Sequence, residues 1–259
     1  MEKFGGNYMK TLAFILNYNT PDMTDRLYES LAPYCGDICD LLILDNGSDK
    51  NLRSKYPTIH IKENCYWGGG LSFAFEYVLS HEQYDSLIFL NSDINLNGEN
   101  FIKTLREDIF VNDYAMASPC VTDLLVGKKQ KSNRHSNSVF RQMANWYTND
   151  CRTVKMLDLQ CPIFHRKVIE KIKSFDSLLN YGWGIGFYCG HVCEKYGWKT
   201  CVDDRIHIEH IGQASWEGGK MNSKFEMDAE NRMMKFLKRK RLISNYKKFM
   251  KEVRLYNKI

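Results

Sequence analysis

Several common signatures are missing from this sequence, and each absence narrows the range of functions. No apolar stretch is long enough to span a bilayer, and the opening MEKFGGNYMK is polar, without an apolar core of signal-peptide length. A GxxxxGK(S/T) motif is absent, which argues against a P-loop nucleotide-binding site. No GxGxxG motif follows the first predicted strand, which disfavours a dinucleotide-dependent oxidoreductase. We therefore expect a cytoplasmic protein outside these two nucleotide-binding classes.

The cysteines also lack a familiar arrangement. There are nine, an odd number, and none forms a CxxC pair. The two closest pairs, Cys35 with Cys39 and Cys189 with Cys193, are four positions apart. This spacing, together with the missing signal sequence, favours reduced thiols. A structural zinc site is not expected from such a pattern.

The charge is divided unevenly along the chain. The whole sequence carries a net charge of +5, yet the segment from Arg232 to Ile259 holds eleven Lys or Arg residues and a single acid, Glu252. The remaining residues hold 25 basic and 30 acidic side chains, so the body is mildly acidic and the C-terminal tail strongly basic. Such a tail predicts an anionic partner, either a membrane surface or nucleic acid.

The tail also interleaves apolar residues with its cations: Met233, Phe236, Leu237, Ile243, Phe249 and Leu255. An amphipathic helix lying on anionic lipid has this pattern. A terminal helix that packs its apolar face on the domain has it too, and both interpretations stay open here. Because no recognised nucleic-acid module accompanies the tail, we expect no nucleic-acid partner.

The first half of the chain alternates strand and helix patterns. Apolar runs predict strands over residues 11–16, 41–44, 58–61 and 86–90, with helices after Thr20-Pro21 and over residues 71–79. This rhythm predicts an α/β fold with a mostly parallel, doubly wound sheet flanked by helices. The second half is less regular: strands are predicted over 154–164, 199–203 and 205–209, a helix over 166–173, and a long basic loop over 127–150.

Polar clusters follow four successive strands of this predicted sheet. They are Asn17-Tyr18-Asn19, Asp45-Asn46-Gly47-Ser48, Asn64 to Gly70, and Asn91-Ser92-Asp93. A single cluster of this kind is usually a turn. In a doubly wound sheet, however, ligands bind beyond the carboxyl ends of the strands. Four clusters at successive strand ends therefore predict a shared binding site.

The residue types suggest what this site binds. The carboxylate of Asp45 would repel phosphate and fits a base N–H edge or a ribose hydroxyl better. The glycines at 68 to 70 open a helix, where the backbone can approach a diphosphate, although they also suit a flexible turn. Asp93 offers a hard oxygen ligand to Mg²⁺ or Mn²⁺. His210, in IEHIGQASW, is the candidate second ligand, and its alternative is an ordinary surface or core histidine.

The runs FILNYNTPD, LLILDNGSD, ENCYWGGG and LIFLNSD, in this order and spacing, resemble the family-two glycosyltransferases of GT-A fold, especially their rhamnosyltransferase-like members. The later YGWGIG and IHIEHIGQASW resemble that group's acceptor-side and closing histidine motifs. The resemblance implies a GT-A, Rossmann-like fold. It divides the chain into a nucleotide-sugar half over 1–125, an acceptor half over 126–230 and a basic helical tail over 231–259.

The resemblance also implies an activity and a set of site residues. The expected reaction is metal-dependent, inverting transfer of a sugar from a nucleotide-diphosphate donor to a glycan or lipid-linked glycan hydroxyl, in surface polysaccharide biosynthesis. Asp93 and His210 would hold the divalent metal, Mn²⁺ or Mg²⁺. The residues expected to line the nucleotide pocket are Asn17, Asn19, Asp45, Asn64, Gly68, Gly69, Gly70 and Asn91. A lipid-linked acceptor would place the basic tail on the inner, anionic face of the cell membrane.

On the acceptor side, three aromatic residues offer flat faces to sugar rings: Tyr181, Trp183 and Trp216. One departure from the family concerns the general base, because relatives carry an acid where this sequence has Gly186. Asp176 and Asp158 are the candidate replacements. If neither acts, the chain is a sugar-nucleotide or glycan-binding module that has lost its base.

Overall fold

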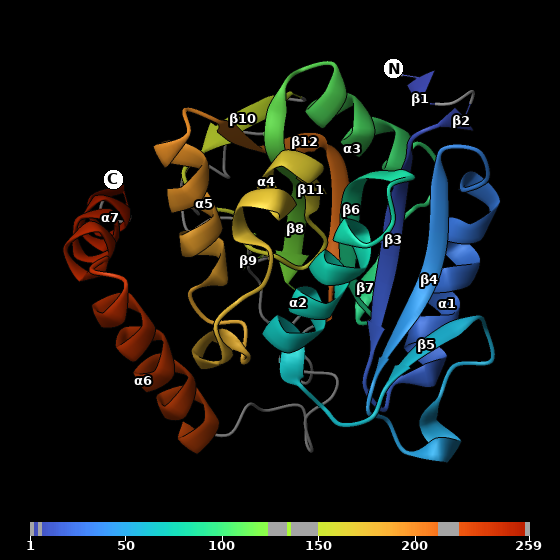
Figure 1. Cartoon of the computed structure of the whole chain (residues 1–259), viewed down its shortest axis with the longest axis horizontal. Helices are drawn as coiled ribbons and strands as arrows, with labels where there is room; N and C mark the ends of the chain where they lie inside the picture. The colour runs from blue at the N-terminus through green and yellow to red at the C-terminus, as the bar shows by residue number, and fades with distance from the viewer. Residues whose placement is uncertain (1–2, 5–6, 124–133, 136–149, 212–222, 257–259) are drawn as a thin grey trace.

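The computed structural model describes residues 3–4, 7–123, 134–135, 150–211 and 223–256 of the chain (Figure 1). The strands are β1 (Lys3–Phe4), β2 (Asn7–Tyr8), β3 (Lys10–Asn17), β4 (Cys39–Asn46), β5 (Thr58–Ile61), β6 (Tyr84–Asn91), β7 (Ile94–Asn95), β8 (Tyr114–Asp123), β9 (Arg134–His135), β10 (Cys151–Val154), β11 (Ile163–His165) and β12 (Lys199–His210). The α-helices are α1 (Pro21–Leu31), α2 (Tyr66–Leu79), α3 (Phe101–Phe110), α4 (Arg166–Ile172), α5 (Ile185–Lys195), α6 (Ser223–Arg239) and α7 (Ile243–Tyr256). Short 3₁₀ turns cover Ala32–Tyr34, Lys50–Leu52 and Ser177–Leu179.

One sheet runs through both halves of the sequence. Its strand order is β10-β12-β8-β11-β6-β3-β4-β5, with β7 pairing to β12 and β9 to β8. The pairs β3–β4, β3–β6, β4–β5 and β8–β12 are parallel, whereas β10 and β11 run antiparallel to their neighbours. The mostly parallel, doubly wound sheet that the sequence predicts is therefore confirmed.

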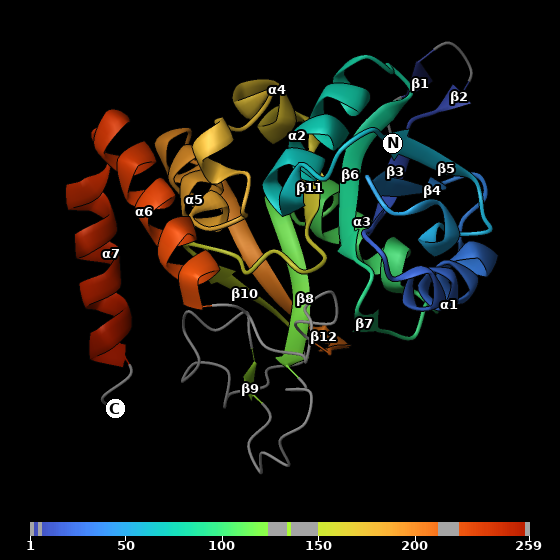
Figure 2. The ribbon, with the colours of Figure 1, turned by 90° about the horizontal axis from the view of Figure 1, so that it is seen from below.

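Helices cover both faces of the sheet and enclose two apolar cores (Figure 2). One core packs α2, α4, α5 and α6 on one face, and the other packs α1 and α3 on the opposite face. Successive side chains of a strand point to opposite faces, so a strand buried on both sides must be apolar throughout. β3 shows this directly, because its residues 12 to 15 are Leu-Ala-Phe-Ile and at most 1% exposed.

The elements predicted for the first half are confirmed, with one difference in detail. Pro21 occupies the first turn of α1, as expected from its fixed φ. Thr20 precedes it, but its hydroxyl does not cap the helix. That hydroxyl instead bonds to the Ser92 hydroxyl at 2.8 Å, which joins the start of α1 to the turn after β6.

Two strand predictions in the second half are wrong. The segment 154–164 is not one strand: β10 ends at Val154 and β11 begins at Ile163. The intervening backbone packs against α5, where the carbonyls of Lys155 and Leu157 approach two glycines. Conversely, the two strands predicted over 199–203 and 205–209 form the single strand β12, whose pairing register with β8 shifts between Asp203 and His207.

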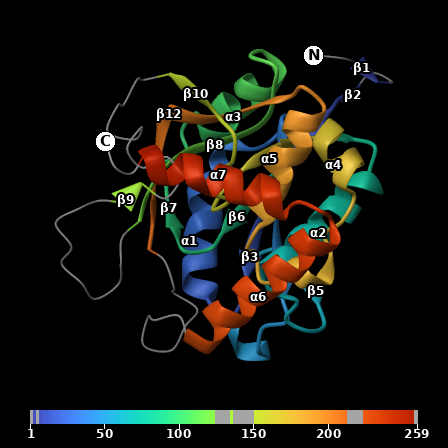
Figure 3. The same cartoon turned by 90° about the vertical axis from the view of Figure 1, so that its left-hand side faces the viewer.

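The basic tail forms α7 and much of α6, and α7 crosses over α5 (Figure 3). Phe236 and Leu237 are at most 1% exposed, Met233 and Phe249 are 5% and 7% exposed, and Ile243 packs partly buried against the same core. The described apolar face of the tail is therefore used to cover the domain, as the second interpretation of its sequence expects. The division of the chain at 125 and 230 stays a prediction, and α6 spans the second of these positions.

Among the described helices, none combines the length and apolar character required to cross a membrane.

Candidate active site

Four strands bring polar residues to one edge of the sheet. β3, β4 and β6 are parallel and each ends in an asparagine: Asn17, Asn46 and Asn91. β12 runs in the same direction, because it is parallel to β8, and both β8 and β6 are antiparallel to β11. Its last residue, His210, therefore reaches the same edge. The shared edge that the sequence predicts is present.

Asp93 and His210 meet at this edge. After Asn91 the chain turns back into β7, and β7 pairs with the end of β12, Ile94 lying opposite His210. The Asp93 Oδ1 and His210 Nε2 atoms are 3.3 Å apart, and each side chain is 14% exposed. The backbone N–H of Ile211 also donates to the Asp93 carbonyl at 2.9 Å. The pairing is thus fixed by main-chain hydrogen bonds on both sides.

The Asp93–His210 separation fits a shared divalent ion. Neighbouring ligands of an octahedral Mg²⁺ with bonds of about 2.1 Å lie about 3 Å apart. Two protein ligands also suit such ions, which keep several positions for water and for substrate phosphates. A carboxylate and an imidazole are ligand types that Mn²⁺ accepts.

The other two residues of the Asn-Ser-Asp motif hold the turn in place. The Asn91 side-chain oxygen accepts from the Trp67 indole N–H at 2.7 Å. The Ser92 hydroxyl bonds to Thr20. The motif is therefore a turn, as its composition suggests, and this turn directs Asp93 towards His210.

Asn17 and Asp45 form a buried pair at the ends of β3 and β4. Both are 0% exposed, and Asn17 Nδ2 donates to Asp45 Oδ1 at 2.9 Å. The second carboxylate oxygen of Asp45 lies 3.2 Å from His60 Nδ1 and 3.6 Å from Arg53 Nε. The His60 and Arg53 side chains are 46% and 36% exposed, whereas Asp45 is fully buried. His60 and Arg53 therefore lie between Asp45 and the solvent. The base contact of Asp45 stays a prediction, and it requires His60 or Arg53 to move aside.

Asn19, Asn46 and Asn64 connect the loops at this edge. Asn19, with φ at +56°, accepts from the Asp49 N–H at 2.9 Å and donates its own N–H to Ser48 at the same distance. Asn46 Nδ2 donates to Asn64 Oδ1 at 3.0 Å. Asn46 is a site residue that sequence reasoning did not single out, although it ends β4 immediately after Asp45 and is only 2% exposed.

The glycines at 68 to 70 form the first turn of α2, which confirms that they open a helix. Gly68 lies so close to the 3₁₀ turn at Ser177–Leu179 that an added Cβ would be 2.2 Å from the Leu179 carbonyl oxygen. Its N–H donates to the Asn180 carbonyl at 2.7 Å. An added Cβ on Gly70 would be 2.9 Å from a methyl carbon of Leu16. Close packing thus explains Gly68 and Gly70, while diphosphate binding by the three glycines stays a prediction.

A pocket of about 550 Å³ lies between the strand edge and α5, α6 and α7. This volume is in the range of small-molecule sites. Its lining includes Asn91, the first residue of the Asn-Ser-Asp motif, and Trp67 beside it. Two carboxylates also line it, Asp158 and Glu230. Glu230 was not identified from the sequence, since nothing in its local pattern distinguishes it from other exposed acids of an amphipathic helix.

The two candidate bases differ in their surroundings. Asp158 lines the pocket, and one of its oxygens accepts from the Leu159 N–H at 3.0 Å. Asp176 is not among the lining residues. Its carboxylate caps the 3₁₀ turn by accepting from Leu178 N–H at 3.0 Å, and it also pairs with Arg239 of α6. The geometry favours Asp158 over Asp176 as a group that can reach a bound acceptor.

Gly186 has a packing reason of its own. It lies in the first turn of α5, where an added Cβ would be 2.3 Å from the Leu157 carbonyl oxygen. One turn later, a Cβ on Gly190 would be 2.0 Å from the Lys155 carbonyl oxygen. An acidic side chain at 186 therefore cannot fit unless the backbone of 155–157 moves. Position 186 is therefore a glycine because α5 packs closely against the backbone of residues 155–157.

The aromatic residues predicted for the acceptor side are only partly exposed to the pocket. Tyr181 and Trp183 both line it. The Tyr181 ring stacks on Phe225 with a centroid distance of 4.5 Å, and the Arg232 guanidinium lies 4.8 Å from its centroid. Trp183 is 36% exposed, which leaves more of its ring open to a ligand. Trp216 lies outside the described residues.

Comparison with known proteins supports the fold rather than a particular relative. No family model and no curated protein matches the sequence. Among solved structures, the chain is similar to GalNAc-T7 solved with UDP, GalNAc and Mn²⁺, with a TM-score of 0.60 and 12% identity over 91% of this chain. The match shows a GT-A glycosyltransferase fold. This chain spans about half the length of that neighbour, since 48% of the neighbour is covered.

Proposed function

We propose that this protein is a glycosyltransferase that moves a hexosyl or deoxyhexosyl group from a nucleoside-diphosphate donor to a hydroxyl of a glycan. The observation that carries the proposal is the meeting of Asp93 and His210, 3.3 Å apart, at the ligand-binding edge of a GT-A sheet. A pocket large enough for a sugar acceptor adjoins this edge. The fold neighbour solved with UDP and Mn²⁺ supports the same donor class.

Asp93 and His210 would hold a divalent cation, Mn²⁺ or Mg²⁺, on the donor diphosphate. When bound, such an ion neutralises the negative charge that develops as the nucleoside diphosphate leaves. The chain's own contribution is to present the two ligands in a fixed geometry. That geometry comes from the β7–β12 pairing and from the hydrogen bonds of Asn91 and Ser92.

For the acceptor, we assign the general base to Asp158. Its carboxylate would take the proton from the acceptor hydroxyl as that oxygen attacks the anomeric carbon of the donor. The new carbon–oxygen bond forms as the bond to the diphosphate oxygen breaks, so the configuration inverts. A base close to the attacking hydroxyl contributes typically 10²- to 10⁴-fold to such a step.

Release of nucleoside diphosphate from UDP- and dTDP-sugars, with a panel of glycan acceptors, tests the proposal. Turnover is expected in Mn²⁺ or Mg²⁺, and loss of turnover is expected with EDTA and with Asp93→Ala. Asp113→Asn is the control, because Asp113 is a 90% exposed acid just before β8 that pairs with Lys167, and asparagine tolerates its φ of +54°. Turnover that survived both EDTA and Asp93→Ala would refute the metal role.

The basic tail extends the proposal to a lipid-linked acceptor at an anionic membrane surface, as in surface polysaccharide biosynthesis. From Lys235 to Lys251, eight cations of α6, α7 and the turn between them are exposed: Lys235, Lys238, Arg239, Lys240, Arg241, Lys247, Lys248 and Lys251. Each is worth about 1 kcal/mol near such a surface. Salt-sensitive sedimentation with phosphatidylserine vesicles, but not with phosphatidylcholine vesicles, is the expected result. Equal sedimentation with both would contradict it.

The packing of Gly186 also favours a second candidate, a binding module without a base. In that case calorimetry shows donor binding, while no acceptor supports turnover. Because an acid does not fit at 186, substitution there cannot restore activity. Whether Asp158 acts as a general base decides between a transferase and a binding module.

A further inference from the structure

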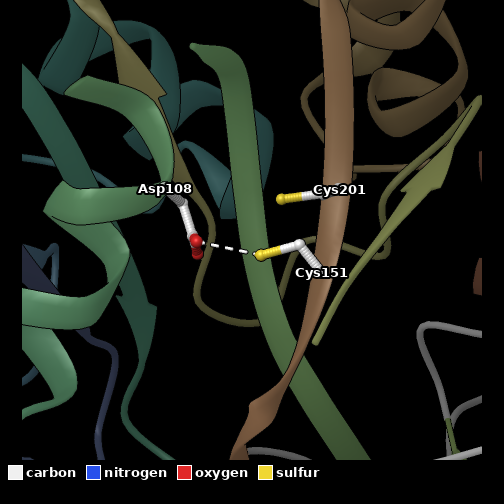
Figure 4. Close-up of side chains that lie close together, drawn as sticks. All are labelled: Asp108, Cys151 and Cys201. Carbon is white, nitrogen blue, oxygen red and sulfur yellow. Dashed lines mark hydrogen bonds between the residues drawn. The ribbon is translucent and has the colours of Figure 1, made fainter. Parts of the chain in front are cut away.

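A second group of potential metal ligands lies on β12, away from the candidate active site. Asp108 of α3, Cys151 of β10 and Cys201 of β12 each place one ligand atom within 4.8 Å of the others (Figure 4). Cys201 precedes His210 by nine residues, roughly 25 Å along a bent strand. The cluster is therefore separate from the Asp93–His210 pair.

The strand register explains why these residues meet. Cys151 lies opposite Asp203 in the antiparallel β10–β12 pair. Cys201 is two residues before Asp203 and so faces the same side of the sheet. Helix α3 covers this side and brings Asp108 over the two sulfurs. Three elements far apart in the sequence thus converge on one point.

One carboxylate oxygen of Asp108 is buried without a hydrogen-bond partner among the described residues. The residue is 0% exposed. Its Oδ1 atom accepts from the Cys151 thiol at 2.9 Å and from Arg205 Nη2 at 2.8 Å. Its Oδ2 atom has no hydrogen-bond partner among the described residues. Buried polar atoms are normally paired, and one that is not points to a bound water or ion.

The cluster is also short of positive charge. Asp203 is 0% exposed, and it shares Arg205 with Asp108, at 2.8 Å from the guanidinium to each carboxylate. Keeping both buried carboxylates, Asp108 and Asp203, ionised with Arg205 as their shared cation is energetically unfavourable. A further cation at Oδ2 would relieve this.

We propose that Asp108, Cys151 and Cys201 bind a zinc ion that ties α3 to the β10–β12 edge of the sheet. A ligand set of two thiolates and a carboxylate selects zinc, whereas Mg²⁺ and Mn²⁺ favour ligand sets made of oxygen atoms. Tetrahedral zinc holds two thiolate sulfurs about 3.8 Å apart, so shifts of about 1 Å complete the geometry. Asp203 is the fourth candidate ligand. Asp108 and Cys201 are buried and Cys151 is half-buried, so the cluster is largely shielded from solvent, as structural zinc sites are.

Charge and protons balance in this proposal. Zinc displaces the two thiol protons to solvent, and the thiolates and Asp108 together carry three negative charges. Arg205, whose Nη2 atom is 3.7 Å from Cys151 Sγ, supplies the positive charge beside them. Hydrogen-bond partners of metal ligands fix the orientation of those ligands and tune the site.

Cobalt titration tests the site in the full-length chain. The Asp93→Ala background removes the candidate active-site ligand, so that only the second cluster reports. We expect a thiolate-to-cobalt charge-transfer band that saturates at one equivalent of Co²⁺. We also expect zinc at 100 times its Kd to raise the Tm by about 5 °C or more.

Cys151→Ser, Cys201→Ser and Asp108→Asn should each weaken cobalt binding at least tenfold. Cys189→Ser is the matched control, because Cys189 is also 0% exposed but lies outside the cluster. It should keep the band. If Cys201→Ser does not fold, Asp108→Asn, which preserves the side-chain volume, gives the answer. Absence of the band in the parent protein, or its persistence in both serine variants, would overturn the proposal.

Discussion

The two ends of β12 carry different chemistry. At its carboxyl end, His210 meets Asp93 beside a pocket, and both side chains remain partly accessible. Nearer its start, Cys201 and Asp203 are wholly buried under α3. The first pair offers hard and borderline ligands with room for a substrate, and the second offers sulfur in a closed cluster. Catalytic metal sites keep an open position and structural sites do not.

This difference assigns separate tasks to one strand. We call the carboxyl end of β12, where His210 meets Asp93, the open end, and the region of Cys201 and Asp203 the closed end. Substitutions at the open end should change turnover and leave the Tm almost unchanged. Substitutions at the closed end should change stability or metal content and leave nucleotide binding intact. Each prediction below tests that separation.

The largest effect is expected at the pocket beside the open end. Asp158→Asn removes a proton acceptor but keeps the shape of the side chain, so kcat should fall by roughly 10²- to 10⁴-fold. Donor affinity, measured by calorimetry, should stay within twofold. Glu230→Gln is the matched comparison, since Glu230 also lines the pocket. A larger loss with Glu230→Gln would move the base to α6.

At the closed end, Arg205→Gln should reduce stability. It leaves two buried carboxylates without their shared cation, which we expect to cost about 3 kcal/mol of unfolding free energy. Denaturant titration measures this loss, and calorimetry with the nucleotide should show unchanged binding. A variant with wild-type stability but impaired nucleotide binding would reverse the roles given to the two ends.

The smallest effect is expected at Gly186 of α5, which lines the pocket. Gly186→Ala forces a methyl group against the Leu157 carbonyl, and overpacking of this kind costs about 1–3 kcal/mol. Gly186→Asp should destabilise at least as much, and neither should raise turnover. An increase in kcat with Gly186→Asp would show that position 186 can hold a base after all.

Most of the open end could be predicted from the sequence. The buried runs before Asn17, Asp45 and Asn91 define strands, and parallel strands end at one edge. The meeting of Asp93 with His210 followed from motifs that resemble a known family. Local patterns could not show that Asp45 is enclosed by His60 and Arg53, because that depends on how the neighbouring loops fold.

The closed end could not be predicted. Its three ligands come from three elements separated by 43 and 50 residues, and cysteine spacing argued against structural zinc. Similarly, the predicted strand over 154–164 failed because contacts with Gly186 and Gly190 outweigh the β propensity of this segment. Tertiary packing decided both cases.

The most direct test of the account is calorimetric binding of UDP and dTDP with and without Mn²⁺. In the parent protein, Mn²⁺ should tighten binding of at least one of these nucleotides by tenfold or more. In Asp93→Ala and His210→Ala that gain should disappear, while in Cys201→Ser it should remain. A Mn²⁺ effect that survives in both Asp93→Ala and His210→Ala, or that is absent from the parent protein, would contradict the assignment of this edge as a metal-dependent donor site.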